Sequence, residues 1–127
     1  MHNFYCFIHI PKTAGTSFSY ILGRNFRGSY HYLHQHLEEG PIDSKYIQKC
    51  LSTGTYLRAL GSHRLTGDIP YDQKDYKVIG IAFVRSPTER LLSEYYYLRN
   101  SELKNEITKS TSLEDFLSKL ESGMNLE

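Results

Sequence analysis

A lysine, a glycine and several hydroxyl residues follow one another in the run Pro-Lys-Thr-Ala-Gly-Thr-Ser, from Pro11 to Ser17. An apolar segment precedes this run and a helical pattern follows it, which is the order of a strand, a tight loop and a helix start. Backbone N–H groups at a helix start lack intrahelical partners, and the helix dipole adds partial positive charge there. We therefore expect a cradle for a phosphate or sulfate group. Its expected members are Lys12, Thr13, Gly15, Thr16 and Ser17.

This run is not a Walker A motif, because its lysine precedes the only glycine instead of following the second one. The physical requirements are nevertheless the same. Gly15 lets the backbone approach an anion closely, hydroxyl and amide groups donate hydrogen bonds, and Lys12 neutralises charge. The alternative is an ordinary strand-to-helix turn whose lysine faces solvent, but the unusual run favours the anion site.

The composition limits the partners of the protein. The 127 residues include 15 Lys+Arg and 14 Asp+Glu, so no global field draws the chain to nucleic acid or to a membrane surface. No apolar strand candidate approaches the ~18 residues that a membrane span needs. Cys6 and Cys50 are too few for a disulfide framework and are expected to act as small apolar residues. Anion binding must therefore come from local clusters.

Strand patterns alternate with helix patterns along the chain. Strands are expected at 4–10, 55–60 and 77–84, and helices after residue 16, at 43–51, after residue 86 and after residue 112. This order predicts an α/β fold of three layers, with a mainly parallel sheet flanked by helices, in a single domain over residues 1–127.

Finer expectations concern the ends and the buried faces of these elements. Thr16 or Ser17 is expected to cap the first helix, and Gly61 to close the second strand. The third strand is almost continuously apolar, which is typical of a strand covered on both faces. Ser86, Pro87 and Glu89 indicate a helix start. The expected buried helix positions include Ile21, Leu22, Ile47, Leu51, Leu113, Phe116, Leu117 and Leu120.

Three strand ends carry cationic or titratable side chains. Lys12 follows the first strand, His63 the second and Arg85 the third, each beside small hydrogen-bonding residues. Ligands of open parallel α/β sheets bind outside the carboxyl ends of the strands, so these side chains are expected at the same edge. Arg85 with Ser93 would form a second anion site. Equally, Arg85 could pair with a carboxylate while Ser93 faces water.

At this point the chain resembles the PAPS-dependent sulfotransferases of the carbohydrate, membrane-associated type. The resemblance is carried by two runs, 8–18 (IHIPKTAGTSF) and 83–95 (FVRSPTERLLSEY). Their order, and the spacing from Arg85 to Ser93, match the pattern of the family. The family often has Asp where this chain has Ser86, a departure that keeps the helix cap.

The resemblance implies a P-loop NTPase-like fold and a reaction without a metal cofactor. A sulfuryl group would move from 3′-phosphoadenosine 5′-phosphosulfate (PAPS), leaving PAP, to an acceptor hydroxyl on a carbohydrate. Lys12, Gly15, Thr16 and Ser17 would bind the 5′ end of PAPS, while Arg85 and Ser93 would bind its 3′-phosphate. Family domains are longer than this chain, so the domain is expected to be incomplete at its C-terminus. Acceptor identity and oligomeric state are left open.

Sulfuryl transfer needs charge stabilisation and a base for the acceptor proton. Lys12 is the expected stabiliser of the leaving phosphate. His63 is the expected base, because histidine titrates near neutrality and Gly61-Ser62-His63 resembles a histidine run of the family. Asp68 is the reserve base. Alternatively, His63 merely caps the strand end or contacts a phosphate.

Two rival functions remain at this stage. One is a P-loop-like kinase or NTPase, although residues 77–84 contain no acidic residue to hold Mg²⁺. The other is a non-catalytic fragment that binds PAP. His9 alternates into a strand interior and is expected to be a satisfied core residue. The spacing of His31, His34 and His36 disfavours a metal site and suggests an acceptor-side loop. With no signal peptide in view, a cytoplasmic location is expected; for an excised fragment it would be the Golgi lumen.

Overall fold

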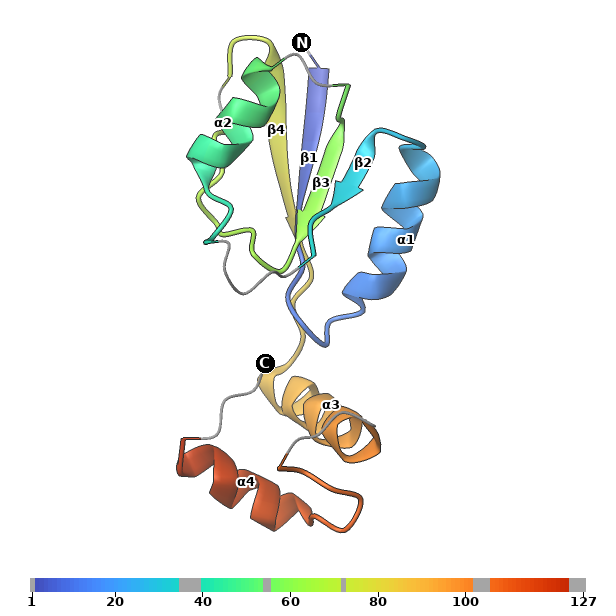
Figure 1. Cartoon of the computed structure of the whole chain (residues 1–127), viewed down its shortest axis with the longest axis vertical. Coiled ribbons are helices and arrows are strands. Elements are labelled where there is room, and N and C mark those ends of the chain that lie inside the picture. The colour runs from blue at the N-terminus through green and yellow to red at the C-terminus, as the bar shows by residue number, and fades with distance from the viewer. Residues whose placement is uncertain (1, 35–39, 54–55, 72, 102–105, 124–127) are drawn as a thin grey trace. The chain divides into compact units, whose positions relative to one another are not determined.

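The structure is a computed structural model that describes residues 2–34, 40–53, 56–71, 73–101 and 106–123. The chain divides into two compact units, residues 1–84 and residues 85–127, and each is described by itself (Figure 1). The first unit contains the sheet, and the second contains two helices. The expectation of a single domain stays a prediction.

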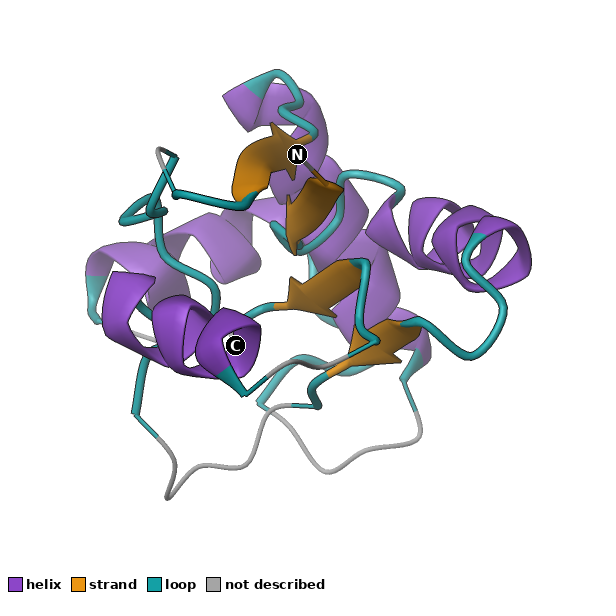
Figure 2. Cartoon of the chain, turned by 90° about the horizontal axis from the view of Figure 1, so that it is seen from above, coloured by secondary structure: helices purple, strands orange, loops and turns teal. Residues whose placement is uncertain are grey.

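The first unit is an α/β layer structure. Its elements are β1 (His2–Ile8), α1 (Gly15–Asn25), β2 (Tyr30–Tyr32), α2 (Ser44–Ser52), β3 (Ala59–Ser62) and β4 (Tyr76–Ala82). Among the described residues, four strands form one sheet in the order β2-β3-β1-β4, and every neighbouring pair is parallel. Figure 2 shows these strands end on, side by side. The predicted α/β fold with a parallel sheet is confirmed.

Alternate residues of β1 connect the sheet to helices on its two faces. Phe4 and Cys6 are fully buried in a core that includes Ile47 of α2. Phe7 points to the opposite face, since side chains alternate along a strand, and its ring lies 4.9 Å from that of Phe18 in α1. The two helices therefore cover opposite faces of the sheet. Burial raises the pKa of the Cys6 thiol to about 12, as expected for an inert apolar position.

A side-chain cap explains the start of α2 but not the start of α1. Asp43 caps α2, where its carboxylate accepts a hydrogen bond of 3.0 Å from the N–H three residues on. The prediction that Thr16 or Ser17 caps α1 is wrong. That helix begins earlier, with Ala14 as a cap residue that makes no side-chain hydrogen bond, so both hydroxyl residues lie inside the first turn. Ile21, expected in the buried face of α1, is 51% exposed.

The glycine expected to close the second strand lies inside it. Gly61 belongs to β3 and pairs with Phe7 of β1 and Tyr32 of β2. A Cβ at this position would lie 2.5 Å from the hydroxyl oxygen of Tyr30. Gly61 is therefore needed because the tyrosine rings of β2 lie over the strand, and the prediction of a strand end there is wrong.

The most apolar strand is not covered on both faces as predicted. β4 lies at the edge of the described sheet, and among its seven residues only Val78 is buried. Val84, which the prediction placed in this strand, follows its end and is 86% exposed. Ile79 and Ile81 are only half-buried, so neither face of this edge strand is fully covered.

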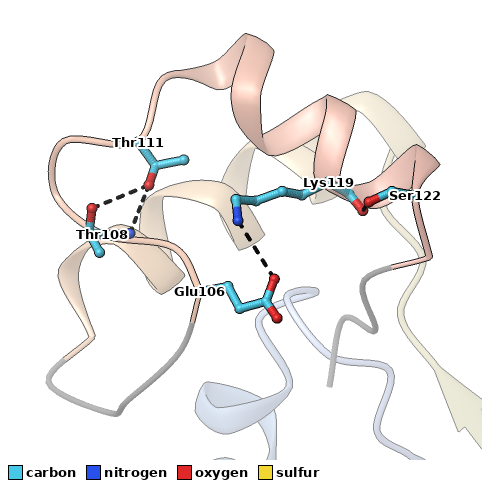
Figure 3. A network of polar contacts seen from close by, with 5 residues as sticks. All are labelled: Glu106, Thr108, Thr111, Lys119 and Ser122. Atoms are coloured by element: carbon cyan, nitrogen blue, oxygen red, sulfur yellow. Dashed lines mark hydrogen bonds and ion pairs between the residues drawn. The ribbon is translucent and has the colours of Figure 1, made fainter.

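The second unit is a pair of helices, α3 (Pro87–Asn100) and α4 (Leu113–Glu121). Its core contains Tyr95, Ile107 and Phe116, and the Tyr95 hydroxyl donates a hydrogen bond of 2.7 Å to the Thr111 carbonyl. The connection to α4 is braced by polar contacts, shown in Figure 3. Among them, the Lys119 ammonium lies 3.6 Å from the Glu106 carboxylate.

Both helix starts of this unit lie where the sequence placed them. α3 has Ser86 at the cap position and Pro87 directly after it, although the Ser86 side chain makes no capping bond. Ser112 caps α4 and accepts a hydrogen bond of 3.1 Å from the Asp115 N–H. Leu113 and Leu117 of α4, expected to be buried, are 37% and 38% exposed. No helix in the described part of the chain is both long and apolar enough to cross a bilayer.

Phe116 should dominate the stability of this second core, because it is fully buried while its neighbour Leu117 is not. We expect Phe116→Ala to lower the free energy of unfolding by about 3–5 kcal/mol. Leu117→Ala is the matched control and should cost less than half of that. Urea unfolding followed by circular dichroism measures both, and equal losses would contradict this assignment of the core.

Candidate active site

The loop between β1 and α1 has an uncommon backbone. Lys12 and Ala14 have φ angles of 63° and 65°, in the left-handed region that residues other than glycine rarely adopt. Between them Thr13 is 7% exposed, and its hydroxyl donates a hydrogen bond of 2.7 Å to the Ile10 carbonyl. Each such backbone position costs on the order of 1–3 kcal/mol, and strain of this kind clusters at ligand-binding and active sites.

The start of α1 presents unpaired backbone donors. The first hydrogen bond of the helix runs from the Phe18 N–H to the Ala14 carbonyl, at 3.4 Å. The geometry of a helix start therefore leaves the N–H groups of Gly15, Thr16 and Ser17 without an intrahelical acceptor. The side chains of Thr16 and Ser17 are exposed, and Lys12 is partly buried just before them. This arrangement can bind an anion.

Gly15 is required by a neighbouring side chain. A Cβ at this position would lie 2.0 Å from Cδ2 and 2.1 Å from Nε2 of His9, far inside contact distance. The imidazole of His9 is thus packed directly on the backbone at the helix start. The sequence reading assigned Gly15 to close approach of an anion, whereas in the structure the group that approaches it is His9.

His9 and His63 form a stacked pair at the carboxyl edge of the sheet. Their ring centroids are 3.9 Å apart at an interplanar angle of 24°. His63 Nδ1 lies 2.6 Å from the His9 carbonyl oxygen. A carbonyl can only accept, so Nδ1 carries the proton and Nε2 of the neutral ring is left as the free base. His63 is exposed, which leaves this nitrogen accessible.

His9 itself is held from a second side. It is 9% exposed, and its Nδ1 lies 2.6 Å from the Tyr32 hydroxyl. Burial, followed by the neighbouring His63, lowers the pKa of His9 from 6.5 to about 4. His9 is therefore a neutral, hydrogen-bonded ring, which agrees with the sequence reading of a satisfied buried histidine. Burial also raises the pKa of Tyr32, so its hydroxyl keeps its proton.

A pocket of about 580 Å³ opens at this edge. Its lining is made of imidazole and phenol rings together with hydroxyl groups. The lining residues are His9, Thr16, Ser19, Tyr32, His34 and His63. The pocket thus joins the start of α1 to the predicted base, and the described residues that line it all belong to the first unit. His36, which was grouped with His31 and His34, lies outside the described residues.

The reserve base is engaged elsewhere. Asp68 accepts two hydrogen bonds from Ser44 at the start of α2, 2.9 Å from the hydroxyl and 3.3 Å from the N–H. It is not among the described residues that line the pocket. Asp68 therefore supports the first turn of α2 in this structure.

The predicted second anion site lies in the second unit. Arg85 precedes α3, and its Nε lies 3.7 Å from the Glu89 carboxylate one turn on. Ser93 is partly buried, a further turn along the same helix. The carboxylate pairing that the sequence left open for Arg85 is thus present. Because each unit is described by itself, the meeting of Arg85 with Lys12 stays a prediction.

Sequence reasoning missed the structural partners of the base. His9 was read as a core residue only, and neither Tyr32 nor Ser19 was considered for the site. Tyr30 and Tyr32 alternate on one face of β2, and their hydroxyl groups lie 2.6 Å from Ser19 and from His9. The period-two spacing of the tyrosines in Tyr-His-Tyr was the available signal.

Comparison with known proteins agrees with this architecture. The model of the sulfotransferase family matches residues 2–126, nearly the whole chain. The chain therefore belongs to the sulfotransferase family, a class of transferases whose members move sulfuryl groups to acceptors. No curated protein and no solved structure matches it. No cluster of three or more potential metal ligands occurs among the residues that the structure describes.

Gly15→Ala should destabilise the protein, because the added methyl group would collide with a ring that its other contacts hold in place. Overpacking of this kind costs about 1–3 kcal/mol. Gly23→Ala, in the same helix, is the control, since its Cβ would meet the Tyr30 ring at an ordinary 3.7 Å. That variant should be neutral or stabilising by up to about 1 kcal/mol. Thermal unfolding compares the two, and equal effects would refute the contact.

Acidification should weaken the fold through His9. The unfolded chain protonates this residue near pH 6.5, whereas the folded state resists protonation down to about pH 4. The contribution of neutral His9 to the free energy of unfolding is thus complete above pH 6.5 and is lost as the pH falls toward 4. His9→Asn should show a smaller loss of stability between pH 7.5 and 5 than wild type. His31→Ala, an exposed histidine of β2, is the control, and an identical loss in His9→Asn would contradict the prediction.

Proposed function

We propose that this chain binds PAPS and transfers its sulfuryl group to an acceptor hydroxyl, with His63 as the base. The observation that carries the proposal is the shared pocket, because Thr16 at the start of α1 and His63 after β3 both line it. An anion at the helix start would thus lie on the same pocket as a free imidazole nitrogen. The family supports sulfuryl transfer in general.

The roles of the residues follow from their chemistry. PAPS supplies an activated sulfuryl group on a phosphate that leaves. The N–H groups of Gly15, Thr16 and Ser17 would hydrogen-bond the 5′ phosphosulfate, and Lys12 would offset the charge that grows on the leaving oxygen. Arg85 and Ser93 would hold the 3′-phosphate, in which case Arg85 must exchange its Glu89 partner for the ligand.

Proton transfer is assigned to one nitrogen. As the acceptor oxygen forms its bond to sulfur, its proton moves to Nε2 of His63, while the bond between sulfur and the phosphate oxygen breaks and PAP departs. Nδ1 stays bonded to the His9 carbonyl throughout, and the resulting imidazolium can donate from both nitrogens. His63 is favoured over Asp68, because Asp68 already accepts two hydrogen bonds from Ser44.

A carbohydrate is the proposed acceptor. The described pocket lining combines flat rings with hydroxyl groups and has no side chain of fixed charge. Such a surface can stack on a sugar ring and hydrogen-bond its hydroxyl groups. The same lining also fits a phenol, so competition between a neutral polysaccharide and a tyrosine peptide would decide the acceptor class.

Calorimetry with PAP and with ATP tests the identity of the sulfuryl donor. We expect PAP to bind without metal and ATP with Mg²⁺ to bind far more weakly. Lys12→Ala should weaken PAP binding by about tenfold or more, because one charge-assisted contact is lost. Lys45→Ala, on exposed α2 surface, should leave it unchanged. Tight Mg²⁺-dependent ATP binding with no PAP binding would favour a kinase or NTPase instead.

Removal of the base should separate catalysis from binding. His63→Ala is expected to slow sulfuryl transfer by about 10²–10⁴-fold while PAP affinity stays within a factor of two or so. Asp68→Asn is the comparison variant and should retain transfer. Turnover is followed as PAP release in the presence of a polysaccharide acceptor. Normal turnover in His63→Ala would exclude this base, and PAP binding without turnover in wild type would indicate a non-catalytic fragment.

A further inference from the structure

We propose that His9 is the positioning residue of His63, with Tyr32 as the anchor that holds His9 in place. The proposal deepens the function above and rests on it, since it concerns the group named there as the base. Three contacts carry it: the histidine stack, the hydrogen bond to the His9 carbonyl and the hydrogen bond to the Tyr32 hydroxyl.

His63 needs support from outside its own strand. It follows Ser62, the last residue of β3, and its side chain is exposed. An exposed imidazole at a strand end is free to rotate and to exchange tautomers unless neighbours restrain it. Here His9 restrains it twice, with its ring by stacking and with its backbone carbonyl by the bond to Nδ1.

Contacts from three elements hold the His9 ring in place. One side of its ring lies against the backbone of Gly15, where not even a methyl group fits. Its Nδ1 is bonded to Tyr32 at 2.6 Å, and the Phe7 ring stacks on it at a centroid distance of 5.3 Å. Contacts from α1, β2 and β1 thus fix one ring, and that ring fixes the base.

His9 must also be neutral to position the base. A protonated His9 would repel a protonated His63 at a ring separation of 3.9 Å and would oppose the imidazolium that forms during transfer. Burial and the nearby His63 lower the pKa of His9 to about 4, so it is neutral at the pH at which a histidine base works. His9 can therefore position the base without competing for the acceptor proton.

The test reads the protonated nitrogen of His63 directly. In ¹⁵N-labelled protein, two-bond ¹H–¹⁵N spectra distinguish the Nδ1–H and Nε2–H tautomers, and loss of a signal in His63→Ala assigns this residue. Wild type should hold the Nδ1–H form at neutral pH. His9→Asn keeps the backbone carbonyl and a group that can bond Tyr32 but removes the ring. His63 then loses the stack that aligns its Nδ1 with that carbonyl, so the population of its Nδ1–H form should fall. Its kcat should fall by up to about 10²-fold with PAP affinity unchanged.

Two further variants isolate the contacts. Tyr32→Phe removes one hydroxyl and should cause a smaller shift in the same direction; it decides the matter alone if His9→Asn does not fold. His31→Ala, the exposed histidine between the two tyrosines of β2, should leave the His63 tautomer unchanged.

An Nε2–H tautomer in wild type, or an unchanged Nδ1–H form in both His9→Asn and Tyr32→Phe, would overturn the positioning role. Activity of His63→Ala is a separate readout. Normal transfer there would refute the proposed base while the tautomer result still decides whether His9 positions the ring.

Discussion

The packing of the His9 imidazole on the backbone of Gly15 is the constraint on which the site depends. Because position 15 carries no side chain, the ring can lie at the start of α1 and still reach both Tyr32 and His63. The helix start that offers N–H groups to an anion is therefore in contact with the ring that stacks on the proposed base. The groups proposed for anion binding and for proton transfer therefore share one small piece of structure.

The parallel sheet explains why these groups meet. β1 and β3 are neighbours, and the residues that follow them, His9 and His63, leave the sheet at the same edge. β2 pairs with β3 on its other side and carries Tyr32 to that edge as well. These three strands thus bring His9, His63 and Tyr32 to the pocket. Helix α1 contributes Thr16 and Ser19 to the same pocket.

Local signals in the sequence predicted the parts of the fold that are determined locally. Helix starts were expected near Asp43 and Ser112, and both residues cap their helices with a hydrogen bond that spans only three residues. The predicted start of α1 was wrong, because no sequence signal marks Ala14 as a cap residue with a left-handed backbone. Gly61 was misread as a strand end because its reason is tertiary: the rings of β2 lie over it.

The sequence indicated which residues belong to the candidate site, but not which contacts hold those residues in place. The residues of the anion loop and His63 were named from their types and from the rule for parallel strand ends. The contacts that support His63 could not be predicted, because they join residues far apart in the chain. His63 stacks on His9, and His9 in turn is hydrogen-bonded to Tyr32. A buried strand of continuous apolar residues was also expected at β4, where pairing on one edge only leaves much of its surface exposed.

Amide and imidazole chemical shifts during a titration with PAP would test most directly whether the anion loop and the base form one site. We predict that the N–H signals of Gly15, Thr16 and Ser17 and the ring signals of His63 change together and saturate at one PAP concentration. PAP binding with these signals unchanged, or responses of the loop and of His63 with different affinities, would contradict a single shared site.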